Sequence, residues 1–241
     1  MRTIFLPETD STNDYLKRHA SKCLEGSDRQ PVCCYAFSQT KGRGRNGRSF
    51  ASDDGGLYIS FLRFGELPPA NVTLVSSVRV LKILEDFFNI DLKIKWVNDI
   101  LIGGRKCVGI LAESAPGYHI IGVGINVYNR LPDDLSEKAA SILLDGNPAT
   151  HRRPADHNTL HELASRLADG WEQDIGEDWM DFYCLRSSVL GSSCVLSDVS
   201  GARIAEGVVV GFGEDGSIVF DEHGVVRTYC SGELLYSLAK A

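Results

Sequence analysis

The most chemically distinctive part of the sequence is a short basic loop, residues 41–48, which reads Lys-Gly-Arg-Gly-Arg-Asn-Gly-Arg. The loop combines four cations with three glycines and contains no acidic residue. The chain as a whole is acidic, with a formal net charge of −7, so this positive charge is a local feature. Glycines let backbone N–H groups approach a ligand, and arginines supply forked donors for phosphate or carboxylate. The loop is therefore predicted to bind an anion.

Two common phosphate-binding motifs do not fit this loop. Glycines at 42, 44 and 47 match the dinucleotide fingerprint, but that motif needs a helix that starts at the loop. Residues 48–56 instead have the composition of a turn, and the sequence has no Gly-Lys-Ser/Thr of a Walker A loop. A solvated basic turn is the structural alternative. It is disfavoured because four neighbouring cations repel one another without a counter-anion.

Other candidate residues have ordinary structural explanations when each is taken alone. Ser11 can cap a helix, with Asp14 three residues later, and Asn98-Asp99 is typical of a turn. Lys106 can be a charge at the end of a strand. Gly122 and Gly124 permit either close approach of a ligand or packing against a helix. Function must therefore be inferred from their combination.

The elements that would position these residues suggest an α+β fold, with a mixed, mostly antiparallel sheet and helices on one face. Strands are predicted at residues 3–6, 32–37, 57–62, 92–96, 100–102, 106–112 and 120–127, and helices at 11–19, 71–88, 138–144 and 160–171. Gly103-Gly104 predicts a hairpin turn, and Asn158 or Thr159 is the expected cap of the last helix.

The pattern changes near residue 188, where a domain boundary is predicted. Short strands at 194–196, 207–211, 218–220 and 225–229 are separated by turns of the Asp-Gly type. This spacing predicts a small, SH3-like β-barrel module. The predicted domains are therefore residues 1–188 and 189–241.

Composition narrows the class of protein. With 43% hydrophobic and 24% charged residues the chain can bury a sizeable core, and a pI near 5.4 argues against a general nucleic-acid binder. The start of the chain has no apolar signal core, and no run reaches membrane-spanning length. Seven cysteines without a Cys-x-x-Cys pair favour neither zinc nor a disulfide framework, so a reducing cytoplasm is expected.

The motifs occur in an order that resembles the biotin–protein ligases (biotin–[acetyl-CoA-carboxylase] ligases). The resemblance covers residues 5–128 strongly and the C-terminal module more loosely, through Gly232-Glu233. It rests on the following stretches: Ser11-Thr12-Asn13, Gln39 with the basic loop, Lys95-Trp96-x-Asn98-Asp99, Lys106-x-x-Gly109-Ile110-Leu111 and Gly122-x-Gly124-Ile125-Asn126. Ser49-Phe50 departs from the family pattern, which often has Lys-Trp there.

The resemblance implies a fold like that of the class II synthetases and biotin ligases, and it implies a two-step reaction. Family members make biotinyl-5′-AMP from biotin and ATP with release of pyrophosphate. They then transfer biotin to one lysine of a biotin carboxyl carrier protein. Mg²⁺ would accompany ATP, with Asp99 as the nearest candidate ligand and no dedicated set of metal ligands in the protein.

The resemblance also implies roles for individual residues. Those implied for biotin are Ser11, Thr12, Asn13, Gln39, Arg43, Gly44, Arg45 and Lys106. Those implied for ATP or the adenylate are Arg45, Asn46, Arg48, Phe50, Asn98, Asp99, Gly124, Ile125 and Asn126. The predicted catalytic residues are Lys106, Arg43, Arg45 and Asp99. The cations would offset repulsion between two anions, and Asp99 is a candidate acceptor of the carrier lysine's proton.

The alternatives are a lipoate–protein ligase-like acyl transferase and a non-catalytic sensor of biotin or nucleotide. No DNA partner is expected, because the ligase motifs begin at Ser11 and leave no room for a preceding helix-turn-helix domain. No membrane partner is expected, because no apolar run reaches membrane-spanning length. A monomer and a homodimer paired through sheet edges are both compatible with the sequence. The basic loop is expected to be poorly ordered without ligand and to close over the hydrolysable intermediate.

Overall fold

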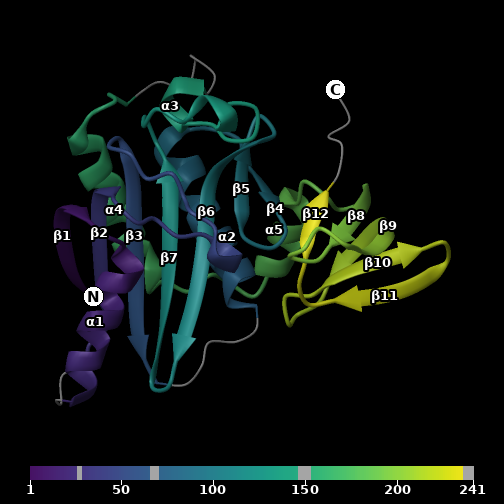
Figure 1. The fold of residues 1–241 in the computed structure, drawn as a ribbon, viewed down its shortest axis with the longest axis horizontal. Helices are drawn as coiled ribbons and strands as arrows, with labels where there is room; N and C mark the ends of the chain where they lie inside the picture. The colour runs from purple at the N-terminus through teal and green to yellow at the C-terminus, as the bar shows by residue number, and fades with distance from the viewer. Residues whose placement is uncertain (26–28, 66–70, 146–152, 236–241) are drawn as a thin grey trace.

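The computed structural model describes residues 1–25, 29–65, 71–145 and 153–235. Its centre is a seven-stranded mixed sheet in the order β1-β2-β3-β7-β6-β5-β4 (Figure 1). The strands are β1 (Arg2–Thr9), β2 (Val32–Gln39), β3 (Gly56–Phe64), β4 (Lys93–Lys95), β5 (Asp99–Ile102), β6 (Arg105–Ala115) and β7 (Tyr118–Asn126). Only β1 and β2 pair in parallel, which confirms the predicted mixed, mostly antiparallel sheet.

The strands alternate between two buried faces. In β2, Cys33, Tyr35 and Phe37 belong to the main apolar core, whereas Val32 and Cys34 belong to a smaller cluster on the opposite face. Both faces are therefore covered, at least in part, by other elements. This is why β2 has a continuous apolar sequence instead of an alternating one.

The helices cover both faces, so the prediction that they lie on one face is wrong for the first of them. Helices α2 (Val72–Phe88) and α4 (His157–Trp171) pack on one face, where Trp171 stacks on Phe61 of β3 at 3.7 Å between ring centroids. Helix α1 (Thr12–Glu25) packs on β2, β3 and β7 from the other side, through Leu16 and Ala20 (Figure 1). None of the described helices is long and apolar enough to cross a membrane.

Several local predictions are confirmed and others need correction. Gly103 and Gly104 both have positive φ, at 55° and 81°, as a tight hairpin between β5 and β6 requires. Helix α4 is capped by the side chain of Asp156, which accepts from the backbone N–H of Thr159, so the predicted cap was misplaced. Helix α3 contains only Ile142–Asp145, and helix α5 (Trp179–Arg186) was not predicted.

A separate five-stranded antiparallel sheet follows, in the order β11-β10-β9-β8-β12. Its strands are β8 (Ser193–Ser197), β9 (Arg203–Phe212), β10 (Ile218–Glu222), β11 (Val225–Tyr229) and β12 (Glu233–Leu235), the last of which was not predicted. All of them lie after residue 188. The assignment of residues 189–241 as a domain, and its closure into an SH3-like barrel, stay predictions.

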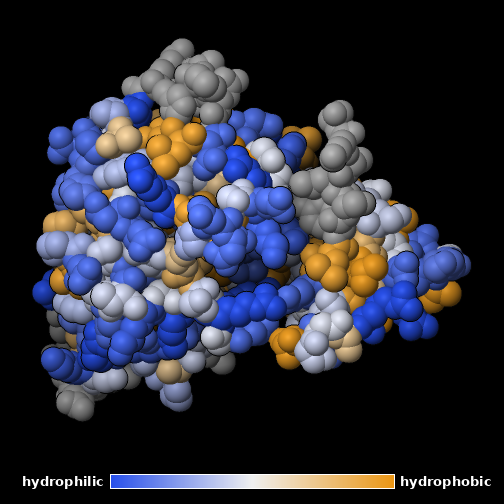
Figure 2. Space-filling model, turned by 45° about the horizontal axis from the view of Figure 1, so that its top comes forward, coloured by the Kyte–Doolittle hydropathy of each residue, from blue (hydrophilic) through white to orange (hydrophobic). Residues whose placement is uncertain are grey.

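The two sheets are joined by a shared core and by specific contacts. The indole N–H of the buried Trp96, which follows β4, donates to the backbone C=O of Gly216 at 2.9 Å. The five-stranded sheet also exposes apolar side chains, and Figure 2 shows orange surface on this part of the molecule at the right of the view. They are Ile204, Val208, Val210, Val225, Val226 and Leu235.

Candidate active site

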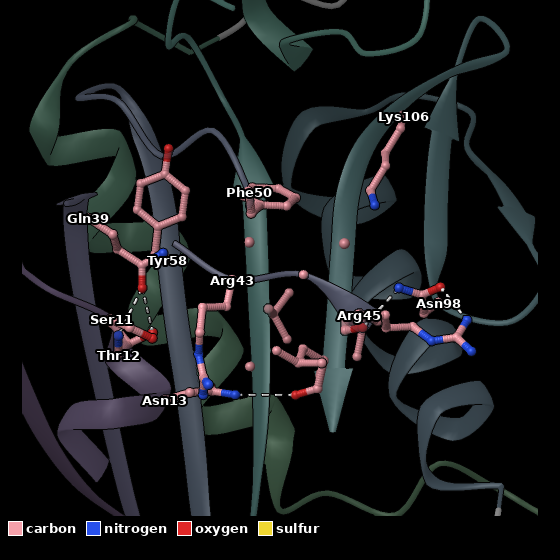
Figure 3. A pocket seen from close by; sticks show the side chains of 17 residues that line it. Ser11, Thr12, Asn13, Gln39, Arg43, Arg45, Phe50, Tyr58, Asn98 and Lys106 are labelled. Atoms are coloured by element: carbon pink, nitrogen blue, oxygen red, sulfur yellow. Dashed lines mark hydrogen bonds between the residues drawn. The ribbon is translucent and has the colours of Figure 1, made fainter. Parts of the chain in front are cut away.

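The main pocket lies on the α1 face of the large sheet, where the N-terminus of α1 meets β3, β6 and β7 (Figure 3). The basic loop crosses in front of it. The lining residues are Ser11, Thr12, Asn13, Gln39, Arg43, Gly44, Arg45, Phe50, Tyr58, Asn98, Lys106, Gly109, Ile110, Leu111, Gly122, Val123 and Gly124. The structure thus gathers in one pocket every residue implied for biotin, although these residues are spread over almost 100 positions of the chain.

A network of neutral polar groups forms the end of this pocket next to α1. The side-chain oxygen of Gln39 accepts from the backbone N–H of Thr12 at 2.8 Å and from its hydroxyl at 3.1 Å. The Gln39 amide donates to Ser52 at 3.1 Å, and the hydroxyl of Ser60 donates to Thr12 at 2.7 Å. Thr12, Ser52 and Ser60 are buried, so these bonds fix the orientation of the polar groups. This end suits an uncharged polar ligand.

Glycines on β6 and β7 make room for the aromatic ring of Phe50. Gly109 and Gly124 are directly paired across the two strands. A Cβ atom would come within 2.9 Å of the ring at Gly109 and within 2.8 Å at Gly124. Since real Cβ atoms do not approach so closely, the ring can lie here only because both residues are glycine. Gly122 makes room for the side chain of Asn13 in the same way, because a Cβ atom at Gly122 would lie 2.3 Å from the Oδ1 atom of Asn13.

The basic loop is a narrow turn whose two sides are hydrogen-bonded. The N–H of Gly44 donates to the C=O of Arg48 at 2.7 Å, and the N–H of Phe50 donates to the C=O of Gly42 at 3.0 Å. A short 3₁₀ turn, Arg45–Gly47, occupies its tip, and no α-helix follows it before β3. The rejection of the dinucleotide motif is therefore confirmed. Poor order of this loop without ligand stays a prediction.

Lys106 stands where the main pocket opens into a second one. Its ammonium lies 2.7 Å from the carboxylate of Asp99 and 5.6 Å from the ring centroid of Phe50. Its backbone is tied to the loop before α3, because its N–H donates to Lys138 and its C=O accepts from Ala140. The ammonium is therefore held at the junction of the two pockets.

The second pocket lies between the large sheet and β12. It shares Gly44, Arg45, Phe50, Asn98 and Lys106 with the first. Its remaining lining residues are Arg48, Ser49, Lys95, Trp96, Asp99, Lys138, Gly232, Glu233, Leu234 and Leu235. The two pockets thus form one continuous cleft that runs past Lys106.

Two polar residues hold the arginines of the loop in this cleft. The side-chain oxygen of Asn98 accepts from Arg45 at 3.2 Å, while its amide donates to the C=O of Ile110 at 3.1 Å. Arg48 pairs with Glu233 at 2.8 Å and so connects the loop to β12. Asn98 therefore orients Arg45 in the cleft.

The charge of the second pocket is strongly positive. Five cationic side chains line it, against the carboxylates of Asp99 and Glu233, each of which already pairs with one of those cations. Burial lowers the pKa of Lys95 from its ordinary value, and the charge of Asp99 opposes this shift. This part of the cleft suits a ligand with several negative charges. No group of three or more potential metal ligands occurs in the described residues.

Not every predicted nucleotide-binding residue lies in the cleft. Gly124, Phe50, Asn98, Asp99, Arg45 and Arg48 line it. The side chain of Ile125 is fully buried in the core, and the buried Asn126 accepts a hydrogen bond from Asn129 at 3.1 Å. Asn46 reaches Glu233 at 3.5 Å instead of lining the pockets. These three residues line neither pocket, and their roles toward the nucleotide stay predictions.

Some residues that shape the cleft were not found from the sequence. Ser52 and Ser60 hold Gln39 and Thr12 at the neutral end, and Tyr58 lines the pocket. Glu113 on β6 holds both Asn13 and Arg43. Each is a single polar residue in a strand or turn and carries no local motif. For Glu113 the available signal was an acid directly after the apolar run 107–112, seven positions beyond Lys106.

Comparisons with known proteins agree with this geometry. Residues 5–127 match the model of the biotin/lipoate A/B protein ligase family. The biotin–[acetyl-CoA-carboxylase] ligase of Mycobacterium tuberculosis is 30% identical over 238 residues, covering 95% of this chain and 86% of the relative. The bifunctional ligase/repressor BirA of Escherichia coli is 26% identical over 239 residues, covering 95% of this chain and 72% of BirA.

A solved structure extends the similarity to the whole fold. The biotin protein ligase of Aquifex aeolicus, in complex with biotin and ATP, matches with a TM-score of 0.76 and 28% identity, covering 99% of both chains. The family model spans just over half of this chain, and the relative from M. tuberculosis matches nearly all of it. On these grounds, the protein belongs to the biotin/lipoate A/B protein ligase family.

Proposed function

We propose that this protein is an ATP-dependent biotin–protein ligase, which activates biotin as biotinyl-5′-AMP and transfers it to a lysine of a carrier protein. The observation that carries this proposal is the continuous cleft, with a neutral polar end at Thr12 and Gln39 and a cationic end around Lys106. A biotinyl-adenylate likewise has a neutral end and a negatively charged part. Its ureido ring is neutral, and its acyl-phosphate is negative.

In the first step, a carboxylate oxygen of biotin attacks the α-phosphorus of ATP. A new P–O bond forms, the bond to the bridging oxygen of pyrophosphate breaks, and pyrophosphate leaves with the electron pair. The reaction brings two anions together, so cations fixed at their meeting point lower the barrier. Lys106 and Arg45 line both pockets and therefore stand at this junction.

In the second step, a neutral lysine amine of the carrier attacks the acyl carbon of the adenylate. An amide bond forms, AMP leaves, and the amine gives up a proton. Asp99 is the proposed acceptor of that proton, because its carboxylate lies in the cleft 2.7 Å from Lys106. The carrier would approach through the second pocket, which β12 borders.

Mg²⁺ is proposed to enter with ATP. It would neutralise charge on the phosphate oxygens. Mg²⁺ is commonly held by one or two carboxylates together with substrate phosphates, and the Asp99 carboxylate in the cationic pocket fits such a role. A site built from protein ligands alone is not needed.

Two rival functions are less well supported. The family model includes lipoate ligases, but the relative from M. tuberculosis and the solved structure from A. aeolicus, which match nearly the whole chain, are described as biotin ligases. A sensor without catalysis has no need for a lysine at the junction of the pockets together with a complete arginine loop. The reaction consumes ATP, and we place it in the cytoplasm.

The proposal is tested by ATP–pyrophosphate exchange with the purified protein. We expect exchange that depends on biotin and is not supported by lipoate. Exchange with lipoate alone would assign the protein to the other branch of the family. Tight binding of biotin without exchange would support the sensor instead.

A further inference from the structure

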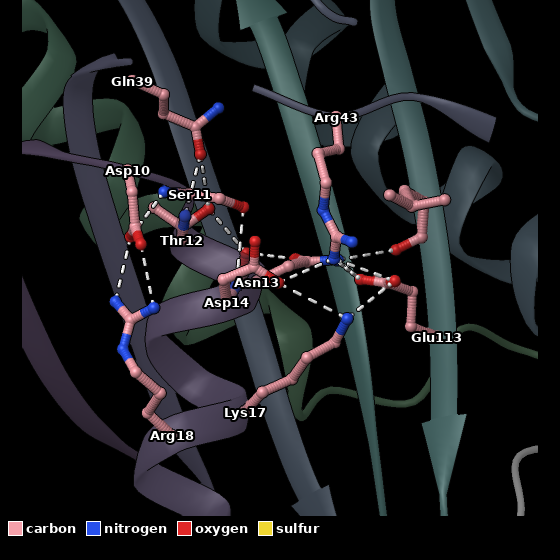
Figure 4. Close-up of polar contacts among 12 residues, drawn as sticks. Asp10, Ser11, Thr12, Asn13, Asp14, Lys17, Arg18, Gln39, Arg43 and Glu113 are labelled. Atoms are coloured by element: carbon pink, nitrogen blue, oxygen red, sulfur yellow. Dashed lines mark hydrogen bonds and ion pairs between the residues drawn. The ribbon is translucent and has the colours of Figure 1, made fainter. Parts of the chain in front are cut away.

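A cluster of charged residues lies behind the basic loop and extends beyond the residues implied for substrate binding. Arg43 reaches across to Glu113 of β6, with its Nη2 atom 3.0 Å from both carboxylate oxygens (Figure 4). The same nitrogen lies 2.8 Å from Asp14 of α1. The loop is thereby tied at one residue to a strand and to a helix.

The carboxylate of Glu113 is itself held in place by two donors. Lys17 donates to Glu113 at 2.9 Å, and the Asn13 amide donates to it at 2.8 Å. Asn13 is buried and its Oδ1 atom lies 2.6 Å from the hydroxyl oxygen of Ser60, so Glu113 is connected to the polar network of the main pocket. The cluster contains two acids and two cations, which makes it neutral as a unit. We call Asn13, Asp14, Lys17, Arg43 and Glu113 the Arg43 cluster.

Arg43 touches the pocket, whereas Glu113 does not. Arg43 is among the lining residues and Glu113 is not, so any effect of Glu113 on a bound ligand must act through its partners. Each ionic contact of Arg43 with a described residue is made by Nη2. A guanidinium has a rigid planar fork, so fixing one nitrogen also fixes the direction of the other donors. Those donors can then serve an anion in the pocket.

We propose that Glu113 is a positioning residue that fixes Arg43 and thereby holds the basic loop over the acyl-adenylate. The inference rests on the proposed ligase function for its ligand, whereas the contact between Glu113 and Arg43 involves residues of the protein alone. Asp14 contributes a second, weaker hold, because it offers one oxygen to Arg43 where Glu113 offers two.

The test uses the full-length Glu113→Gln variant, which keeps the size of the side chain and removes its charge. In the presence of biotin and ATP, we expect the adenylate to escape roughly tenfold faster, because a charge-assisted bond to Arg43 is weakened. Glu177→Gln is the matched control, since it removes the charge of an exposed glutamate far along the chain. Its release rate should equal that of the wild type.

Repeating the measurement in the Arg43→Met variant shows whether Glu113 acts by positioning Arg43 or through a general effect on the structure. If Glu113 acts through Arg43, Glu113→Gln should change adenylate release less than about twofold when Arg43→Met is already present. An equal effect in both backgrounds, or unchanged release in the single variant, would overturn the proposal. If Glu113→Gln does not fold, Asp14→Asn must show the same dependence on Arg43, with a smaller effect.

Limited trypsin digestion without ligand tests the hold on the loop independently of the enzyme's activity. The loop offers cleavage sites at Lys41, Arg43, Arg45 and Arg48. We expect cleavage there to be several-fold faster in Glu113→Gln than in Glu177→Gln. If the wild type lacks biotin-dependent exchange but this difference is present, the ligase function fails and the hold on the loop stands. Equal cleavage in both variants would remove the structural basis of the proposal.

Discussion

The ring of Phe50 lies directly over Gly124, so closely that a Cβ atom at residue 124 would come within 2.8 Å of it. Phe50 follows the basic loop by two positions and is hydrogen-bonded to Gly42 of the loop, whereas Gly124 belongs to β7. This contact therefore limits how closely the loop can approach the sheet. The same ring lines both pockets and lies near Lys106. Gly124 on β7 therefore determines where the ring of Phe50, which lines both pockets, can lie.

Gly124→Ala is expected to displace the Phe50 ring and to raise the KM for ATP. Overpacking of this kind costs about 1–3 kcal/mol when the neighbours cannot shift, which corresponds to roughly 5- to 150-fold in KM. The measurement is pyrophosphate exchange at varied ATP concentrations. Gly211→Ala is the control, since a Cβ there meets nothing within 4 Å. An unchanged KM in Gly124→Ala would show that the ring does not shape the nucleotide site.

Lys106→Met should lower the rate of adenylate formation. Removing a preorganised positive group from the meeting point of two anions typically costs about 100-fold or more in rate. Rapid-quench measurement of biotinyl-AMP in the first turnover separates this effect from product release. Lys93→Met, which removes an exposed lysine of β4, should behave like the wild type. A rate within twofold of the wild type in Lys106→Met would exclude Lys106 from the chemical step.

Arg45→Gly is predicted to loosen the hold on the adenylate and to cause labelling of unrelated lysines. Arg45 lines both pockets and is oriented by Asn98 at 3.2 Å, so its loss opens the middle of the cleft. We expect release of biotinyl-AMP to rise by roughly tenfold, together with biotinylation of a bystander protein. Arg203→Ser, at an exposed position of β9, serves as control. Unchanged release would contradict the assignment of Arg45.

Trp96→Phe tests the connection between the two sheets. The substitution keeps an aromatic ring but removes the N–H that donates to Gly216, leaving that buried contact unmade. We expect a loss of about 1–2 kcal/mol in the free energy of unfolding. Urea denaturation monitored by circular dichroism gives this value. Trp179→Phe is the comparison, and an equal stability of Trp96→Phe and wild type would mean that the bond contributes nothing.

The stability of the protein should depend on pH through Glu113. Burial raises the pKa of this carboxyl, but hydrogen bonds from Lys17 and Asn13 and the charges of Lys17 and Arg43 outweigh it, so the pKa lies below its ordinary value of 4.5. The ionised form is therefore favoured in the folded protein. Its contribution is fully present above pH 4.5 and is lost as the pH falls through the lowered pKa.

Urea denaturation of the wild type and Glu113→Gln at several pH values measures this contribution. We expect the wild type to be more stable by about 1 kcal/mol at pH 7, with a difference that shrinks in acid. Asp14 faces the same cations and is unchanged in both proteins, so it does not account for the difference. A difference that stays constant with pH would show that ionisation of Glu113 is not involved.

Much of the fold and the cleft could be predicted because the signals are local. Apolar runs of strand length, the helical spacing of α2 and the Gly103-Gly104 turn each specify an element without help from the rest of the chain. The basic loop was recognised from its charge density alone. The order of the motifs then assigned Thr12, Gln39 and Lys106 to one site.

The features that could not be predicted from the sequence depend on which strands become neighbours in the sheet. Ser60 and Gly122 are paired across β3 and β7, and this register places Asn13 between them, which no local pattern indicates. The position of α1 is another example. Its apolar stripe shows that it packs on a sheet but not on which face. Ile125 was assigned to the nucleotide through its motif, yet the alternation of β7 turns it into the core.

One cleft is proposed to activate biotin and to deliver it to a single lysine of the carrier. The decisive experiment incubates the purified protein with biotin, ATP, Mg²⁺ and a biotin carboxyl carrier domain, followed by intact-mass and peptide analysis of the carrier. We predict one biotinyl group per carrier on one lysine, dependent on ATP and abolished in Lys106→Met. An unmodified carrier, together with absent biotinyl-AMP, would contradict this account.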